Sequence, residues 1–240
     1  MAAPTLNSQA TNSQATGTSM NVAVGAGTNA GILVYVVSRS TSESFTTPTL
    51  TGVTFAAVSP DPIPARGQHR DKLYWAYGSW SAANVVCGFS QSTVHAAQAV
   101  IFDGVDATAP FTYIKYRNTL GDSGASTGGT DTVAMDITFD NTDVDQLMTV
   151  FCSSRNRPTN SNPADAAYTR IGSVASGTGG SDQTITSEYR TLSPTGSDTW
   201  NANTTGTAVD WCTAALLVNQ PAGGGGGPTL RLLASTGVGT

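Results

Sequence analysis

The sequence predicts an all-β protein, a single jelly-roll-like antiparallel β-sandwich of about 10–12 short strands with extended N- and C-terminal arms. Two observations predict this class. Apolar residues fall in short runs bounded by Gly, Pro, Asn, Asp and Ser, as strands and turns do. No segment carries a sustained apolar stripe at helical spacing. A chain of 240 residues can bury a sizeable core as one such domain.

Residues 94–111 form the stretch around which the predicted sheet is organised. Small and apolar residues lead into Ile101-Phe102 and stop at Asp103-Gly104. A run bounded in this way indicates a strand that is buried on both faces and enters a tight turn. Gly104 suits such a turn because glycine adopts a positive φ without strain.

The other predicted strands follow one another along the chain. A continuous β-branched run at 31–38 indicates a second central strand. Further strands are predicted at Met20–Val24, Leu50–Val58, Lys72–Tyr77, Asn84–Ser90, Thr132–Phe139, Gln146–Ser153, Tyr168–Val174, Thr184–Leu192, Thr199–Asn203 and Val209–Asn219. Loops are predicted at 59–64, which contains three prolines, and at the polar stretches 118–131 and 154–166.

Two tails flank the predicted β-sandwich domain of residues 28–222. Residues 1–27 are polar and uncharged, contain a perfect five-residue tandem repeat, and are typical of either a floppy tail or an extended arm that adds to a neighbouring sheet edge. Residues 223–240 join a glycine linker to a short apolar peptide, which is either a docking peptide or a tail folded onto its own domain. As partner-binding residues of the two arms we select Asn7, Gln9, Asn12, Gln14, Leu230, Arg231, Leu232 and Leu233.

Charged residues make up only 11% of the chain, and the net charge is −5. The absence of a basic cluster argues against nucleic-acid binding, which depends on phosphate neutralisation. The apolar runs are too short to span a membrane, and we expect no secretory signal because a charged n-region and an apolar h-region are both missing. Three scattered cysteines, Cys87, Cys152 and Cys212, favour buried free thiols over one disulfide with a spare thiol.

The sequence names no catalytic site. Gly121-Asp122-Ser123-Gly124 imitates a serine-protease string, but neither His69 nor His95 has the surroundings of a triad base. Glycoside hydrolysis needs two closely placed carboxylates, and the only glutamates, Glu43 and Glu188, form no such pattern. We therefore predict no enzymatic activity and no cofactor.

Two weaker binding sites remain as hypotheses. Carboxylates that follow a strand, Asp140, Asp143 and Asp145, suit Ca²⁺, although this composition is also ideal for a turn and the turn is favoured. Trp80 and Trp200 are candidates for stacking on sugar rings if they are exposed, whereas a place in the core is the favoured alternative.

Several strand motifs occur in a familiar order. They are Ile32–Val37, Val53-Thr54-Phe55, Leu73–Tyr77, Val85–Ser90, Gly104-Val105-Asp106 with Pro110, Gln146–Val150, and Ala215–Val218 before Pro221. In this order, over roughly residues 28–222, the chain resembles a family of jelly-roll-like β-sandwich domains of phage virion proteins (head decoration or tail) and bacterial extracellular repeats.

The resemblance implies a structural role and no particular chemistry. We expect a virion protein made in the host cytoplasm, a capsid decoration or accessory subunit that is anchored by its arms. Its partners would be other virion proteins, such as the major capsid or tail protein, and further copies of itself, with no nucleic acid and no membrane. The alternative is a host-binding module of the tail or fibre that recognises surface glycans.

Overall fold

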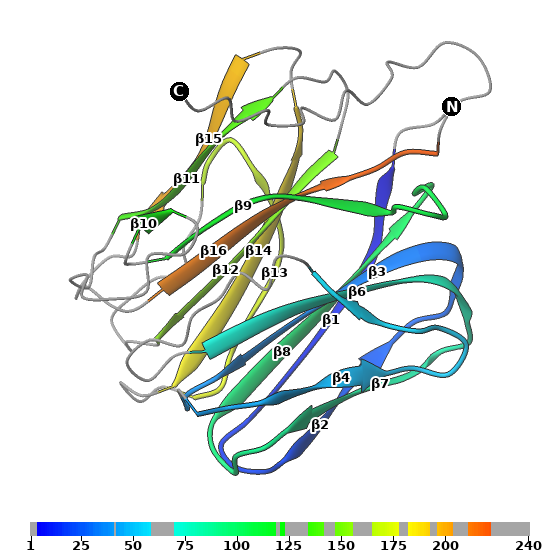
Figure 1. The fold of residues 1–240 in the computed structure, drawn as a ribbon, viewed down its shortest axis with the longest axis vertical. Coiled ribbons are helices and arrows are strands. Elements are labelled where there is room, and N and C mark those ends of the chain that lie inside the picture. Colours follow the sequence, from blue (N-terminus) through cyan, green and yellow to red (C-terminus); the bar gives the residue numbers. More distant parts are fainter. Residues whose placement is uncertain are drawn as a thin grey trace, which may run out of the picture.

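A computed structural model describes residues 4–40, 42–58, 70–118, 121–122, 134–141, 147–155, 165–177, 182–192, 196–203 and 211–221. Every regular element in these ranges is a β-strand, and the strands pair antiparallel (Figure 1). This confirms the predicted all-β class and is consistent with a β-sandwich, while the jelly-roll connectivity stays a prediction. The described part of the chain holds no helix that could cross a membrane.

The strands form four sheets, numbered here in the order in which they pack. Sheet I contains β2 (Ser19–Val24), β7 (Ala83–Phe89) and β4 (Phe45–Thr49). Sheet II has the order β1 (Thr5–Gln14), β8 (His95–Asp103), β3 (Gly27–Ser38), β6 (Arg70–Trp80) and β5 (Ala56–Ala57). Sheet III has the order β10 (Gly121–Asp122), β9 (Phe111–Asn118), β16 (Trp211–Val218), β12 (Leu147–Arg155), β14 (Gln183–Thr191) and β13 (Thr169–Ala175). Sheet IV pairs β11 (Ala134–Asn141) with β15 (Gly196–Asn203).

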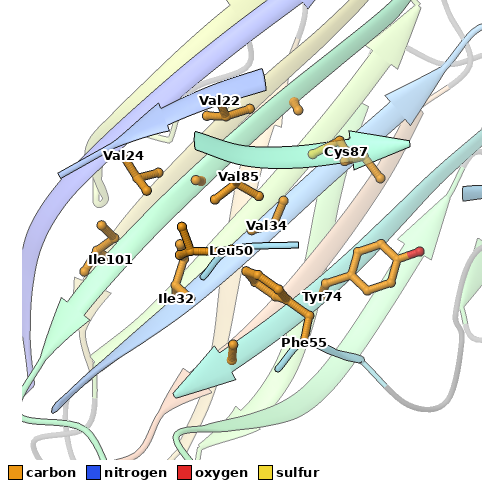
Figure 2. Close-up of a cluster of buried hydrophobic side chains, with 14 of the residues drawn as sticks. Val22, Val24, Ile32, Val34, Leu50, Phe55, Tyr74, Val85, Cys87 and Ile101 are labelled. Carbon is orange, nitrogen blue, oxygen red and sulfur yellow. The ribbon is translucent and has the colours of Figure 1, made fainter. Parts of the chain in front are cut away.

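Three hydrophobic interiors lie between the four sheets. Sheets I and II enclose the first, where Val22 and Val85 of sheet I face Ile32 and Val34 of sheet II (Figure 2). The second lies between sheets II and III, and the third between sheets III and IV. The body is thus thicker than a two-layer sandwich, and the central strands of its two inner sheets are covered on both faces.

The inner sheets explain the most apolar stretches of the sequence. Every residue of β8 from His95 to Phe102 is buried, as is nearly all of β3. This confirms the prediction of a strand buried on both faces at the centre of the chain. Gly104 has a φ of 68° in the turn that follows, as predicted.

Two predictions about elements need correction. Residues 5–24 are not a separate arm, because β1 pairs with β8 and β2 pairs with β7 of the same chain. The predicted strand Leu50–Val58 is broken by Gly52, whose φ is 99°. Within it only the two residues of β5 form a strand, and Leu50 and Val53 form an isolated bridge. A side chain on Gly52 would come within 2.6 Å of the Ser79 carbonyl oxygen, so the turn passes too close to β6 for any other residue.

Candidate functional site

The two tryptophans selected for sugar binding are both part of the core. Trp80 is 6% exposed and donates its indole N–H to the Gly25 carbonyl at 2.8 Å. Trp200 is 1% exposed and donates to Glu188 Oε2 at 2.7 Å. Neither ring has a free face, so the hypothesis of exposed stacking aromatics at these positions is wrong and the core alternative holds.

Several other predicted site residues cannot be placed as a site. Asp140 lies in β11, whereas Asp143 and Asp145 fall outside the described residues. Ser123, His69 and the C-terminal residues Leu230, Arg231, Leu232 and Leu233 also lie outside them. The described residues contain no group of three metal-ligating side chains.

A buried polar cluster surrounds Glu43, in the connection between β3 and β4. One carboxylate oxygen accepts hydrogen bonds from Ser38 Oγ at 2.9 Å and from His95 Nε2 at 2.9 Å. The other oxygen accepts from the Ser90 backbone N–H at 2.6 Å, the Ser90 hydroxyl at 3.0 Å and the Gln91 N–H at 3.2 Å. Glu43 and His95 are both fully buried, and sequence reasoning missed this pairing because the two residues are far apart in the chain.

Burial and hydrogen bonding fix the charges of this cluster. Burial raises the pKa of Glu43, but the hydrogen bonds from His95, Ser38 and Ser90 together lower it by more. The resulting pKa lies below the ordinary value of 4.5. Burial lowers the pKa of His95 below 6.5 against the opposing effect of Glu43. At neutral pH the cluster is therefore a carboxylate that accepts from a neutral imidazole.

The Glu43 cluster has the residue types of a catalytic triad in the wrong order. In a triad the histidine lies between the acid and the nucleophile. Here the carboxylate lies between His95 and Ser38, and the second imidazole nitrogen, Nδ1, faces Gln14 Nε2 at 3.5 Å. Phe89 stacks on the imidazole with 3.7 Å between ring centroids. The cluster has no nucleophile on its base, and its carboxylate and imidazole are both fully buried. We therefore assign it to holding the β3–β4 connection against β8 and the residues that follow β7.

A second polar group crosses the interior between sheets II and III. Tyr35 of β3 and Ser153 of β12 both donate hydrogen bonds to Asp71 Oδ2 of β6, and their hydroxyl oxygens lie 2.8 Å apart. Burial, followed by the neighbouring Asp71 charge, raises the pKa of Tyr35 well above 10. The phenol therefore stays protonated, and the group links the two inner sheets by hydrogen bonds.

A third polar group surrounds Glu188 of β14, which is 2% exposed. Its oxygens accept from Arg170 Nε at 3.0 Å, from Trp200 Nε1 at 2.7 Å and from the Asp165 backbone N–H at 3.0 Å. These donors come from β13, β15 and the chain just before β13. Glu188 therefore joins the edge of sheet III to sheet IV.

The three cysteines are free and buried, as predicted. Burial raises the pKa of Cys87 and of Cys152 to about 12 and that of Cys212 well above 9. One thiol lies in each interior: Cys87 between sheets I and II, Cys212 between II and III, and Cys152 between III and IV. None is a candidate nucleophile.

An open groove of about 490 Å³ lies beside β4 and β7. Its lining consists of Thr47, Pro48, Thr49, Leu50, Thr51, Val53, Thr54, Phe55, Asn84 and Val86. None of these side chains titrates near neutral pH, so the groove offers hydroxyl and apolar contacts but no acid, base or metal ligand.

The remaining candidate is the outer edge of sheet II, formed by β1. Among the described residues β1 pairs with β8 alone, so no other described strand pairs with its outer edge. The selected arm residues also bind within the chain: Asn7 donates to Asp103 Oδ2 at 2.7 Å, Asn12 donates to the Asn21 carbonyl at 2.6 Å, and Gln14 contacts His95. The segment predicted to reach a partner therefore lies in its own sheet and presents an unpaired edge.

Comparison with known proteins identifies no relative: no family model, no curated protein and no solved structure matches the chain. The candidate site is therefore defined by its own geometry, as an uncharged β-edge that no other described strand pairs with.

Proposed function

We propose that the chain is a phage virion structural protein, a capsid decoration or accessory subunit that attaches to the particle by strand pairing. The observation that carries this proposal is the open edge of β1, a ten-residue strand that pairs on one side only within the described part of the chain. An edge of this kind supplies a row of backbone donors and acceptors to a partner strand.

The chemistry of the interior supports a structural role over a catalytic one. The ionisable residues of the Glu43 and Glu188 groups are used in contacts that join sheets or strands. Catalytic groups need access to a substrate, and Glu43, His95 and Glu188 are at most 2% exposed.

The surface composition also supports assembly. Charged residues make up 11% of the chain, about half the usual share, so Ser, Thr, Asn, Gln and Gly supply most of its polar side chains. Such a surface carries little charge repulsion between neighbouring subunits, which favours packing at the high local concentration of a particle.

The test is to purify the particles that cells carrying this gene release and to measure the chain in them by quantitative mass spectrometry. We expect a fixed number of copies per particle that resists washing in high salt, because strand pairing depends little on charge. Particles that contain none of the chain, while the chain stays in the soluble fraction, would contradict the proposal. Binding of the free chain to host-surface glycans, with none in the particle shell, would favour the host-binding alternative.

A further inference from the structure

The exposed edges of the four sheets differ in how well they are protected against pairing with another chain. Natural sheets protect their edges with short strands, prolines, charges or bulges. β5 and β10 have two residues each, and β4 contains Pro48. β1 has ten residues without proline or charge, and its single bulge lies at Asn7, between Leu6 and Ser8. Seven regularly paired residues, Ser8–Gln14, are therefore left unprotected.

The backbone of β8 shows which groups β1 presents to the outside. The Arg39 N–H bonds to the Val94 carbonyl, so the even-numbered residues of β8 turn their backbone groups toward β3 and the odd-numbered residues turn theirs toward β1. The partners of these odd-numbered residues in β1 are the even-numbered ones, such as Ala10 opposite Ala99. Gln9, Thr11 and Ser13 therefore direct their N–H and C=O groups to the open edge.

The hydrogen bond of Ser13 agrees with this assignment. Its N–H bonds to Oδ1 of its own neighbour Asn12 at 2.8 Å and not to β8. The side chain of Asn12 thus caps one outward donor of an edge that is otherwise open. An incoming strand would replace this cap by a backbone carbonyl.

We propose that the edge of β1 pairs with β1 of a second copy of this chain, antiparallel about a two-fold axis at Thr11. In an antiparallel pair of identical strands, opposite residues must both point outward or both inward, so their numbers share parity. The axis at Thr11 meets this condition and uses the whole regular segment: Thr11 lies opposite its own copy, Gln9 opposite Ser13, Ala10 opposite Asn12, and Ser8 opposite Gln14.

The residues of β1 suit this self-pairing. Every opposed pair is uncharged, and the pairs Thr11 with Thr11 and Gln9 with Ser13 can exchange side-chain hydrogen bonds. No like charges meet across the axis, which is the usual obstacle to pairing two copies of one strand. Sheet II would then continue through the dimer as one sheet.

Sheet III ends beside the same edge and enlarges the contact. Its edge strand β13 lies next to β1, where a Cβ added to Gly172 would come within 2.9 Å of both Gln9 and Gln98. Two layers therefore end together on this side of the molecule. A second copy would meet both layers, which matters because a single pair of seven-residue strands is a small interface. The inference concerns self-assembly and stands whether or not the chain belongs to a virion.

The experiment compares substitutions at Thr11 in the full-length chain by analytical ultracentrifugation. Thr11→Pro removes only an outward N–H, so the ladder with β8 remains intact and pairing between copies is blocked. Thr11→Val keeps the N–H and the branched shape and is the matched control. At about 100 µM, which detects micromolar dissociation constants, we expect dimers for the wild type and monomers for Thr11→Pro, with unchanged circular dichroism. Thr11→Val loses only the hydroxyl contact across the axis, so its dimer should be weakened by no more than about fivefold.

A second pair of variants tests the edge without proline. Asn12→Lys places a positive charge on each side of the two-fold axis and should weaken the dimer by about tenfold or more. Asn84→Lys adds the same charge to the exposed Asn84 of β7, away from this edge, and should leave the dimer unchanged. A monomeric wild type, a dimer that survives Thr11→Pro in folded protein, or equal weakening by both lysine variants would overturn the inference.

Discussion

The only two glutamates of the chain are both buried, one in the β3–β4 connection and one in β14, and they use different partners. Glu43 is completely buried and receives all its side-chain hydrogen bonds from neutral groups, among them the imidazole of His95. Glu188 is 2% exposed and receives a bond from the guanidinium of Arg170 and one from the indole of Trp200. Each joins segments that are distant in the sequence. In a chain with few charges, a buried carboxylate therefore acts as a hydrogen-bond acceptor that connects elements.

The difference between the two sites lies in what removal of the carboxylate leaves behind. Without Glu43 several neutral donors lose their acceptor, and without Glu188 the guanidinium of Arg170, which is 33% exposed, also loses a negatively charged acceptor. A hydrogen bond that involves a charged group contributes more to stability than one between neutral groups.

Glu188→Ala should destabilise the protein most, by about 3–5 kcal/mol, because Arg170, Trp200 and the Asp165 N–H lose their shared acceptor. Urea unfolding followed by circular dichroism measures this loss. Glu188→Gln is the matched control, since an amide oxygen still accepts from Trp200, and it should recover more than half of the loss. Equal effects of the two variants would show that the charge on Glu188 contributes nothing.

Glu43→Ala should cost about 2–3 kcal/mol, because the donors left in the interior are neutral. Ser38, Ser90 and His95 lose their acceptor, whereas no charge is left behind at neutral pH. The same unfolding measurement decides the order of the two sites. A larger loss for Glu43→Ala than for Glu188→Ala would reverse the comparison.

The Glu43 site should make stability depend on pH. The pKa of His95 lies below 6.5 in the folded state, so the unfolded chain binds more protons and stability falls as pH drops below about 6.5. The pKa of Glu43 lies below 4.5, so its contribution is present above that pH and is lost as pH falls through the folded value.

Unfolding free energies measured from pH 8 to pH 4 for the wild type and for His95→Gln test this sign. In the variant the loss between pH 7 and pH 5 should disappear, while the loss at lower pH should remain. A wild type that is equally stable at pH 7 and pH 5 would contradict the assignment. Among the described contacts, those of two charged residues reach this group: Glu43 binds the His95 imidazole directly, and Arg70 donates to the backbone carbonyl of Glu43.

The smallest effect is expected at Gln98, a buried residue whose side-chain amide has no hydrogen-bond partner among the described residues. It is fully buried in β8, and neither amide atom has a hydrogen-bond partner among the described residues. Gln98→Leu removes an unsatisfied amide and keeps a similar volume, so it should be neutral or stabilise by about 1 kcal/mol. Thermal unfolding measures the change. The control is Gln183→Leu, because Gln183 is also fully buried but does have interaction partners. Destabilisation by Gln98→Leu would show that its amide is satisfied.

The sequence predicted the parts of this structure whose signal is local. The β-branched run of β3 and the apolar run of β8 indicate central strands on their own, and both are buried on two faces. Gly104 could be assigned to a turn because its conformation depends on its own residue type.

The parts that the sequence did not predict depend on distant partners. Asn, Ser and Gln have low strand propensity, so β1 resembled a tail, and only its register against β8 makes it a strand. Glu43 gained its role from Ser90 and His95, which are 47 and 52 residues away. The sequence left open whether Trp80 and Trp200 are exposed or belong to the core, because the exposure of an aromatic side chain depends on the layers that cover it. The structure places both in the core.

The distribution of the cysteines gives the protein a built-in set of probes. Each interior contains one thiol that is shielded from solvent, and each thiol belongs to a different gap between neighbouring sheets. A thiol-specific reagent can react only when its gap opens, so the three labelling rates report separately whether the stack comes apart from sheet I, from sheet IV or all at once. The order in which the layers separate can be read from the natural chain, without introducing a single label.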